Sequence, residues 1–485
     1  MAPHVGPRRF RCAADLERRG VDRGRGPGRL PVLSGEPHDR RDELFDSARP
    51  AAEPGRLENT QIGRIAHCRN GFTHGAQESG SLRVAGGSRF GHPDSFVGDN
   101  SIFHDRGTPI AHNGPMPIGM DAADRVLGSV RALLPSIADT AADVDRAGAV
   151  DPEVLLALHD AGYFTMLQPA RFGGLQARPD SFLTVTRELS AACASTGWLA
   201  GWLAVNSWHL ALFDDRAQDE VWGADPRALV ATSYGPTGRL ERIAGGFRLS
   251  GRWNHCTGIG QASWLLAAAL LVAPDGSAED FLVALVPRSD YTIEPTWNGL
   301  GLRGIGADDA VVPGAGVEVP AYRTFGFVST DQLATLPPLY RLPQPTLYSH
   351  TGTMPLQGAA LRLLAGVPPG PALDPIEMAR SGVELSMLQI RRNLTDLMDS
   401  VESGSGPDSD LILRSRRDQV VASERAIQAV QTVVRNPPPG FDEALAERLW
   451  RDVQTARNHV ASNVDQVLSV VGRFAYGLRV DDLLW

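Results

Sequence analysis

The sequence predicts an α+β protein in which helices come first, a β-domain follows and helices return. Apolar residues recur at three- and four-residue spacing from about residue 121 to 213. The period becomes strand-like between about 229 and 327, and helical spacing returns from about 355 to 470. This order of elements differs from the strand–helix alternation of a Rossmann fold.

The first helical block opens with ADRVLGSVRALLPSIADTAADVDRAG, which has the spacing of an amphipathic helix. A second helix is predicted in DPEVLLALHDAGYF, with Asp151 as its N-cap, Pro152 at its first position and Gly162 as its stop. Two more helices are predicted in PDSFLTVTRELSAACASTGWLAGWLAVNSWHLALF. The second of these is rich in small and aromatic residues, so we expect it to be buried.

The strand-like block contains the runs ALVATSYGP, GGFRLSGRW, SWLLAAALLV, DFLVALVP and AVVPGAGVEVP, separated by turns with Gly, Pro and Asp. In the last block, the longest helix is expected over SDLILRSRRDQVVASERAIQAVQTVV. We therefore expect a helical domain at 116–228, a β-domain at 229–327 and a second helical domain at 328–485.

Residues 1–115 differ in composition from the rest of the chain. They contain seven of the 12 histidines and 17 arginines against 14 acidic residues, whereas the rest has 30 arginines against 42 acidic residues. One interpretation is a disordered extension, because such a segment buries little apolar surface. The other is a mis-assigned start codon, with the natural start at Met116 or Met120. Either way, we assign no function to residues 1–115 and expect them to be dispensable.

The bulk composition excludes several classes of function. The 485 residues carry a formal charge of −9, which argues against a nucleic-acid groove. There is no lysine, which excludes Schiff-base chemistry and a P-loop. The four cysteines, Cys12, Cys68, Cys193 and Cys256, form no CxxC pair, so neither a metal site nor a disulfide framework is expected. Without a signal peptide or an apolar span, a cytoplasmic protein with no membrane partner is expected.

From about residue 121 onward, the chain resembles the flavin-dependent monooxygenases built on the acyl-CoA dehydrogenase fold. Within them it is most similar to oxygenase components of two-component aromatic hydroxylases, such as p-hydroxyphenylacetate and seco-steroid phenol hydroxylases. The matching strings include LHDAGYFTMLQPARFGG, ACASTGWLAGWLAVNSWHLALF, TSYGPTG, GRWNHCTGI, WNGLGLRGIGADDAVV, RSRRDQVVASERAI and RLWRDVQTARNH. They occur in the order in which the family has them.

The resemblance implies an N-terminal helical domain, a middle β-barrel and a C-terminal four-helix bundle, assembled as a homotetramer. It implies reduced FMN or FAD and O2 as cofactors, with an NAD(P)H-dependent flavin reductase as partner. A flavin C4a-hydroperoxide then hydroxylates a small aromatic substrate, for example a polycyclic or polyketide-derived one.

For the cofactor, the resemblance implies contacts from two parts of the chain. Thr257 matches a serine or threonine that bonds the flavin N5, and Cys256 lies beside it; on residue type alone, Thr257 ends a turn and Cys256 is a packing residue. Trp208 is expected against the flavin. Arg303 in GLRGIGADD is expected to bond flavin carbonyls or phosphate, which suits the planar guanidinium, and Arg417 in RSRRDQV is expected to reach the flavin phosphate from the helical bundle.

For catalysis, the resemblance points to His459 in RLWRDVQTARNH. We expect this histidine on the same helix as Asp452, about two turns further along. An imidazole with a pKa near 6.5 can donate to a peroxide and exchange a proton near neutrality. The alternative is a surface histidine of the helix. Asn458 and Asn463 are expected to border the same pocket.

Substrate contacts are expected from Asn206, His209 and Ser233. Relatives that act on simple phenols often have a histidine where Asn206 stands, and an asparagine cannot serve as a base near pH 7. His209 is equally consistent with a core histidine whose hydrogen bonds are satisfied. A second departure is the pair Asp308 and Asp309, where relatives usually have Ser, Asn or Thr.

Three alternatives remain open from the sequence. A true acyl-CoA dehydrogenase needs a glutamate base, and VVGRFAYG lacks the usual tyrosine-glutamate-glycine element, although another helix can supply the glutamate. An amino-sugar N-oxygenase has the same fold and the same flavin chemistry. A flavin-free member of the fold would act as a scaffold.

Overall fold

The computed structural model describes residues 118–326, 333–367 and 374–478. The predicted extension 1–115 lies outside these described residues. Along the described chain, helices precede a sheet and helices follow it, which confirms the α+β order. None of the helices in the described part of the chain is long and apolar enough to cross a membrane.

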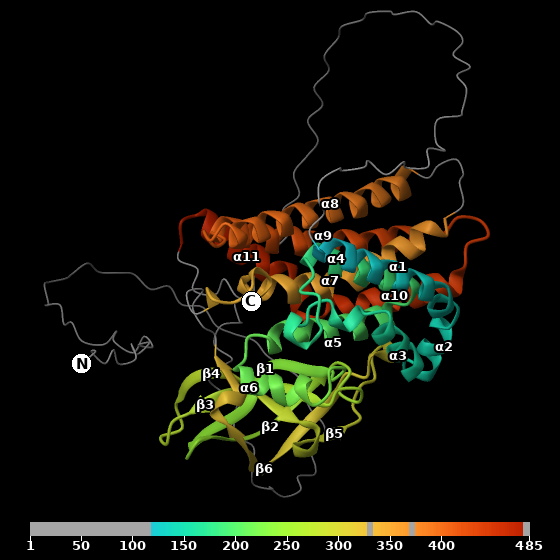
Figure 1. Ribbon diagram of the computed structural model, residues 1–485. Coiled ribbons are helices and arrows are strands. Elements are labelled where there is room, and N and C mark those ends of the chain that lie inside the picture. The colour runs from blue at the N-terminus through green and yellow to red at the C-terminus, as the bar shows by residue number, and fades with distance from the viewer. Residues whose placement is uncertain (1–117, 327–332, 368–373, 479–485) are drawn as a thin grey trace, which may run out of the picture. The chain divides into compact units, whose positions relative to one another are not determined.

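Helices form the first part of the described chain (Figure 1). They are α1 (Ile118–Asp139), α2 (Ala141–Ala147), α3 (Pro152–Asp160), α4 (Pro179–Ala192), α5 (Ala194–Leu210) and α6 (Asp215–Gln218). Asp151 caps α3 as predicted, because its side chain accepts a hydrogen bond from the backbone N–H of Glu153. The helix expected over 123–148 is instead two helices separated by Thr140, whose hydroxyl donates to the carbonyl oxygen of Ser136 at 3.1 Å.

Helix α5 lies between the sheet and the long C-terminal helices (Figure 1). All 17 of its residues are buried, which confirms the prediction of a buried helix. Cys193 adopts an extended conformation, with φ of −149°, and so separates α5 from α4. Because α5 packs on β1 on one side and on α7 on the other, its side chains reach both halves of the molecule.

The strands form one seven-stranded sheet in the order β5-β6-β2-β1-β3-β4-β7. They are β1 (Val230–Ile243), β2 (Gly246–Cys256), β3 (Trp264–Val272), β4 (Ala278–Pro287), β5 (Thr292–Glu294), β6 (Asp308–Pro320) and β7 (Thr324–Gly326). Neighbouring strands are antiparallel except β1 and β3, which are parallel. Within the described residues β5 and β7 are the edges, so backbone pairing does not close the expected barrel into a ring.

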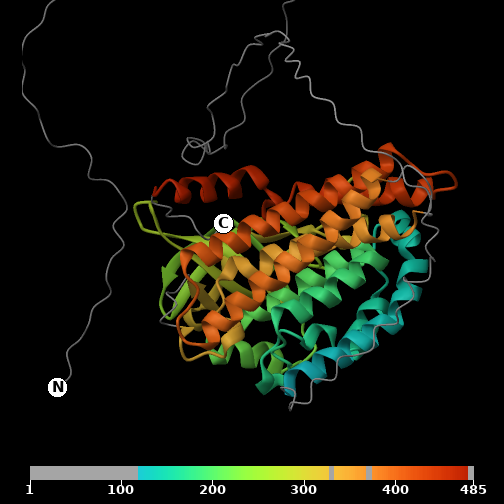
Figure 2. The ribbon, with the colours of Figure 1, turned by 90° about the horizontal axis from the view of Figure 1, so that it is seen from above.

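Helices return after the sheet. They are α7 (Gln344–Ala365), α8 (Asp374–Glu402), α9 (Ser409–Arg435), α10 (Glu443–Arg457) and α11 (Val464–Ala475). Figure 2 shows α8 and α9 side by side, and α7 and α10 pack against α9. The expectation that α9 would be longest is wrong, since α8 has 29 residues and α9 has 27. Exposed apolar residues such as Met378 and Leu388 obscure the amphipathic pattern of α8.

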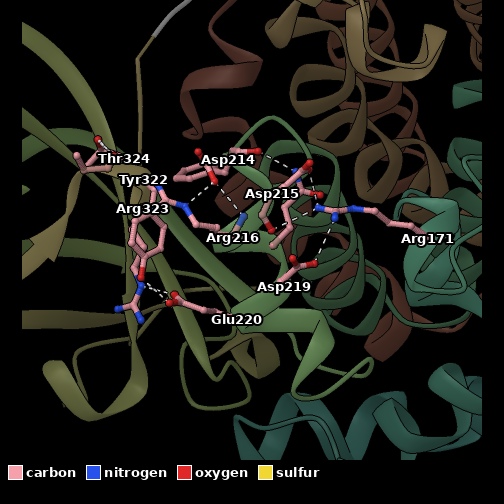
Figure 3. Close-up of polar contacts among 12 residues, drawn as sticks. Arg171, Asp214, Asp215, Arg216, Asp219, Glu220, Tyr322, Arg323 and Thr324 are labelled. Carbon is pink, nitrogen blue, oxygen red and sulfur yellow. Dashed lines mark hydrogen bonds and ion pairs between the residues drawn. The ribbon is translucent and has the colours of Figure 1, made fainter.

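Charged residues join α6 and the helical turn η3 (Asp219–Gly223) to the short helical turn η6 (Ala321–Arg323) that follows β6 (Figure 3). We call this group the α6 ion cluster; its members are Arg171, Asp214, Asp215, Arg216, Asp219, Glu220, Tyr322 and Arg323. Arg171 lies 2.8 Å from Asp215 and 3.2 Å from Asp219. Glu220 accepts hydrogen bonds from Tyr322 and Arg323. The cluster therefore fixes the N-terminal helices to the sheet.

Candidate active site

A cavity of about 1550 Å³ lies where α5, the sheet, α7, α9 and the segment after α10 meet. Ligand pockets commonly measure about 300–1,000 Å³, so this one has room for more than one small molecule. Its walls include three tryptophans: Trp198, Trp202 and Trp297. Five of the residues predicted to contact or border the site also line it: Asn206, Ser233, Thr257, Asn458 and His459.

One face of α5 supplies the first wall. Trp198, Trp202 and Asn206 follow each other at four-residue spacing, which places them in a row on a helix. Trp208 is on another face of α5, where its Nε1 donates to the carbonyl oxygen of Leu339 at 2.8 Å. It does not line the cavity, so the expectation that it contacts the flavin is not supported by this geometry.

The end of β2 and the turn after it supply a second wall. The pairing of β2 with β6 shifts register between Trp253 and Cys256, and within this irregularity His255 has a positive φ of 58°. Such a conformation is uncommon for a residue other than glycine and occurs often at functional sites. As a result, Asn254, His255 and Thr257 line the cavity, while Cys256 points into the core.

Thr257 lies in the turn that follows β2, as predicted. Its Oγ1 accepts a hydrogen bond from the indole N–H of Trp198 at 3.4 Å, so its own hydroxyl proton is available to a ligand. Cys256 is fully buried, its Sγ lies 3.4 Å from the carbonyl oxygen of Trp253, and burial raises the pKa of the thiol to about 12. Cys256 is therefore a packing residue and not a cofactor contact.

His459 lines the cavity but, contrary to the prediction, it does not lie on the same helix as Asp452. Helix α10 ends at Arg457, and His459 caps the next short helix: its Nδ1 accepts a hydrogen bond from the backbone N–H of Ala461 at 3.2 Å. The ring packs against Trp198 and Trp202, with centroid distances of 5.4 and 4.9 Å.

These contacts determine the protonation state of His459. Burial, and secondarily the charge of His255, lower the pKa of His459 to about 4, so the ring is neutral at pH 7. Because Nδ1 accepts a hydrogen bond, the single proton is at Nε2. This low pKa does not favour the predicted exchange of a proton near neutrality, and it leaves Nε2–H as a hydrogen-bond donor.

Asn206 belongs to a buried network of hydrogen-bonded side chains. Its Nδ2 donates to the carbonyl oxygen of Val230 at 2.7 Å, and its Oδ1 accepts from the Tyr348 hydroxyl at 2.9 Å. Tyr348 in turn accepts from the Tyr234 hydroxyl at 2.6 Å, and Tyr234 bonds to Nδ1 of His209. This hydrogen-bond network fixes the orientation of the Asn206 amide.

His209 is the last member of that hydrogen-bond network and does not line the cavity. Its Nε2 is 3.5 Å from Nε2 of Gln344, and burial lowers its pKa to about 3. The interpretation as a core histidine with satisfied hydrogen bonds is the correct one. Ser233 does line the cavity, and its hydroxyl donates to the carbonyl oxygen of Asn254 at 3.0 Å.

Three further predicted contacts point away from the cavity. Arg303 is exposed and donates to the carbonyl oxygen of Asp145 at 2.8 Å. Arg417 is exposed and pairs with Asp418 at 2.8 Å. Asn463 is the exposed N-cap of α11. Arg416, by contrast, lines the cavity, because successive residues of a helix point about 100° apart. Arg417, which was predicted to contact the flavin, therefore does not face the cavity, whereas its neighbour Arg416 does.

A glycine-rich loop is fixed against α10 and forms part of the cavity wall. A Cβ on Gly301 would lie 2.2 Å from the backbone carbon of Arg451, so only glycine fits there. Asp452 accepts a hydrogen bond from the backbone N–H of Leu302 at 2.6 Å, and burial raises the Asp452 pKa to about 6. Arg451 forms a bidentate ion pair with Asp145, with distances of 3.0 and 2.7 Å.

The acidic pair Asp308 and Asp309 also supports the wall. Asp309 accepts hydrogen bonds from Asn254 at 2.6 Å and from Arg252 at 2.9 Å. Asp308 accepts from the backbone N–H of Trp297 at 2.9 Å. This departure from the family pattern therefore positions two residues of the cavity wall.

Sequence reasoning missed Tyr348, Tyr234, Trp202 and Arg416 among the residues of the cavity. A signal for Tyr348 was present, because LYSHTGTM places several polar residues in a long helix that is almost wholly buried. Polar residues in a buried helix indicate a hydrogen-bonded network or a cavity.

The cavity wall also contains donors without acceptors. Nε1 of Trp202 and Nε2 of Gln454 are buried and have no hydrogen-bond partner among the described residues. Neither aspartate nor glutamate occurs among the described residues that line the cavity. The wall is thus aromatic, rich in donors and free of negative charge, which fits a planar ligand with acceptor atoms.

Comparisons with known proteins agree with this architecture. Residues 123–223 match the acyl-CoA dehydrogenase N-terminal domain, and residues 378–464 match the C-terminal domain of that family. The chain is 34% identical over 388 residues to the flavin-dependent monooxygenase oxygenase subunit HsaA of Mycobacterium tuberculosis, covering 75% of this chain and 98% of that protein. It is 30% identical over 400 residues to the oxygenase component of the FADH2-dependent resorcinol hydroxylase of a Rhizobium species, covering 76% of this chain and 98% of that protein.

Among solved structures, the crystal structure of HsaA from M. tuberculosis superposes with a TM-score of 0.71, covering 75% of this chain and all of HsaA. XiaF from a Streptomyces species, solved with FADH2 and glycerol, is 26% identical and superposes with a TM-score of 0.67, covering 74% of this chain and 97% of XiaF.

Proposed function

The chain belongs to the family of flavin-dependent monooxygenase oxygenase subunits with acyl-CoA dehydrogenase domains, and from this premise we propose how its residues serve the reaction. It is the oxygenase component of a two-component system that hydroxylates an aromatic substrate, and a separate reductase supplies the reduced flavin. When bound, reduced flavin supplies the two electrons with which one atom of O2 enters the substrate and the other leaves as water.

The residues of the cavity fit a reduced flavin, either FAD or FMN. The unpartnered N–H groups of Trp202 and Gln454 would donate to acceptor atoms of the ring system. The Thr257 hydroxyl, held by Trp198, would orient the ring from the side of the sheet. We assign no flavin contact to Cys256, Trp208, Arg303 or Arg417, because none of them lines the cavity. We also propose that the protein assembles as a homotetramer.

The catalytic donor in this proposal is His459. Its Nε2–H is available because Nδ1 is already bonded to the backbone, and its low pKa keeps it neutral. A neutral donor stabilises charge on an oxygen atom without losing its proton. Asn206 and Ser233 would bind polar groups of the substrate.

The proposed substrate is a polycyclic or polyketide-derived aromatic compound. Asn206 cannot act as a base, and His209 is shielded behind Tyr234, so the cavity lacks the histidine typical of relatives that act on simple phenols. The volume of about 1550 Å³ supports a ligand larger than one ring beside the flavin.

The absence of carboxylates from the described lining of the cavity carries the distinction from an acyl-CoA dehydrogenase, which needs a glutamate base. The test is to supply the full chain with reduced flavin from a flavin reductase, NADH and ¹⁸O₂ together with a panel of polycyclic phenols. We expect a product that contains one ¹⁸O atom. The proposal is wrong if no aromatic compound is oxygenated while an acyl-CoA thioester reduces the oxidised flavin.

A further inference from the structure

Arg416 on α9 is a buried arginine in the wall of the cavity. It is only 6% exposed. Its one hydrogen bond among the described residues runs from Nη1 to Oε1 of Gln419, and no carboxylate in the described chain forms an ion pair with it. A guanidinium has five N–H donors, so most of this donor capacity is unused.

A buried charge without an opposite partner is unfavourable, because the charge has lost its hydration. Desolvation lowers the pKa of Arg416 only to about 10, so the side chain is still charged at neutral pH. A side chain in this situation gains most from an anionic ligand that presents oxygen atoms to the fork of the guanidinium.

The rest of the wall does not neutralise this charge. The other arginine that lines the cavity, Arg457, has a carboxylate partner in Glu424 at 3.6 Å. No aspartate or glutamate lines the cavity within the described part of the chain, so the net charge of the wall is positive. Arg416 is the source of positive charge that has no internal counter-ion among the described residues.

Hydrogen bonds place Arg416 near the proposed reaction centre. Gln419, which holds Arg416 through Oε1, donates from Nε2 to the carbonyl oxygen of Ala461 at 3.2 Å and to Thr353 at 2.6 Å. Ala461 in turn donates its backbone N–H to His459. Only Gln419 and Ala461 therefore stand between the arginine and the proposed catalytic histidine.

We propose that Arg416 forms a carboxylate-binding subsite of the cavity and that the substrate is an aromatic compound with a carboxylate that pairs with this arginine. This inference rests on the proposed function and narrows the class of substrate. A flavin phosphate has the same oxyanion chemistry. We assign the subsite to the substrate because the arginine is connected to His459, at the end of the cavity where oxygen transfer is proposed.

The test measures dissociation constants for aromatic carboxylates of one, two and three rings, each paired with its neutral carboxamide. The full chain is used, both alone and loaded with reduced flavin under anaerobic conditions. For at least one pair, the wild type should bind the acid tenfold or more tightly than the amide. Arg416→Gln should weaken binding of that acid about 30-fold or more, as expected when one partner of a buried charge pair is removed, and should leave the amide within threefold.

Two further variants distinguish a ligand contact from a structural role. Arg425→Gln is the matched control: Arg425 is on the same helix and also donates to a glutamine, Gln389 at 3.0 Å, but it does not line the cavity. It should preserve the preference for the acid. Arg416→Lys keeps the charge and should retain part of that preference even if Arg416→Gln folds poorly.

Three outcomes would overturn the inference. In the first, no acid binds the wild type better than its amide. In the second, Arg416→Gln binds acids as the wild type does. In the third, Arg416→Gln weakens FMN tenfold but not riboflavin, which lacks the phosphate; this would assign the arginine to the cofactor. All three are binding measurements, so they are distinct from a failure of the proposed hydroxylation.

Discussion

The α6 ion cluster and the cavity both contain arginines, which are at least partly exposed and paired with carboxylates in the cluster, whereas the cavity contains a buried arginine. In the cluster, Arg171 is 39% exposed and lies between Asp215 and Asp219 (Figure 3). In the cavity, Arg416 is 6% exposed and has no carboxylate partner in the described chain. Solvated ion pairs contribute about 0–1 kcal/mol each, whereas a buried charge without a partner is destabilising.

The difference between the two regions indicates that the cavity contains groups that destabilise the fold and serve ligand binding. The cluster connects helices to the sheet with interactions that water and salt weaken. The cavity retains a buried guanidinium, unpartnered N–H groups of Trp202 and Gln454, and a histidine with one free donor. Unsatisfied polar groups are rare in protein interiors, so those in the cavity wall are consistent with a ligand site.

The strongest test of this difference removes the free donor of the cavity. His459→Ala should lower the single-turnover rate of hydroxylation about 10²–10³-fold, as loss of one aligned donor does in other enzymes. His459→Gln should recover part of the rate, because its amide can donate. The rates are measured by rapid quench of the protein–reduced flavin complex mixed with O2 and substrate. A wild-type rate in His459→Ala would make the histidine structural.

The pH dependence of the same reaction sharpens this prediction. The pKa of His459 is lowered to about 4, so the ring stays neutral above about pH 5. We expect no change in the hydroxylation rate attributable to His459 between pH 6 and 8. A transition near pH 6.5 that is present in the wild type and absent from His459→Gln would contradict the neutral-donor assignment.

The next test concerns Asp452, the buried carboxylate behind the cavity wall. Its pKa is raised from 3.8 to about 6 by burial, so the folded state favours the protonated form. The resulting stabilisation is fully present below pH 3.8 and is lost as pH rises through about 6. Relative to Asp452→Asn, the wild type should gain about 1.4 kcal/mol in the free energy of unfolding between pH 7.5 and pH 5.

Urea denaturation of both proteins at the two pH values measures this difference. Asparagine keeps an acceptor for the N–H of Leu302, so the variant isolates the charge. Equal pH dependence of the two proteins would show that Asp452 is not protonated in this range.

A smaller effect is expected for Thr257→Ala. Removal of one hydroxyl hydrogen bond is worth about 0.5–1.5 kcal/mol, or roughly a two- to tenfold change. The ratio of hydrogen peroxide released to product formed should rise by that factor, while reduced-flavin affinity stays nearly unchanged. If only the melting temperature falls, Thr257 merely supports the turn and the indole of Trp198.

The smallest effect should come from the α6 ion cluster. Glu220→Gln weakens its contacts with Tyr322 and Arg323 and should reduce the free energy of unfolding by about 1 kcal/mol or less. Salt should diminish the difference, and hydroxylation should be unaffected. A loss of hydroxylation comparable to that of His459→Ala would remove the distinction between the two regions.

Much of the fold was predictable because it follows from local spacing. The cap at Asp151, the buried α5 and the turn that carries Thr257 all depend on residues close together in the sequence. The break at Thr140 was missed, because a single hydroxyl bond to the backbone does not interrupt the apolar period. The length of α8 was missed, because its exposed apolar residues obscure the period.

The candidate site was predictable only in part. Thr257, His459, Asn458, Asn206 and Ser233 line the cavity, and all five occur in strings that resemble the family. Arg417 was predicted to contact the flavin, yet it pairs with Asp418 away from the cavity, and its neighbour Arg416 lines the cavity instead. Spacing shows that two neighbours face different ways, but it cannot show which of them faces the cavity.

By itself, the sequence determined the order of the elements, the family and the removal of a histidine base at Asn206, because these depend on residue identity and short-range periodicity. The tertiary structure alone decided that His459 is neutral with its proton at Nε2, that His209 is enclosed by Tyr234 and Gln344, and that Arg416 is buried without a carboxylate. Protonation and pairing depend on desolvation and on hydrogen bonds between residues far apart in the chain, and only folding brings those residues together.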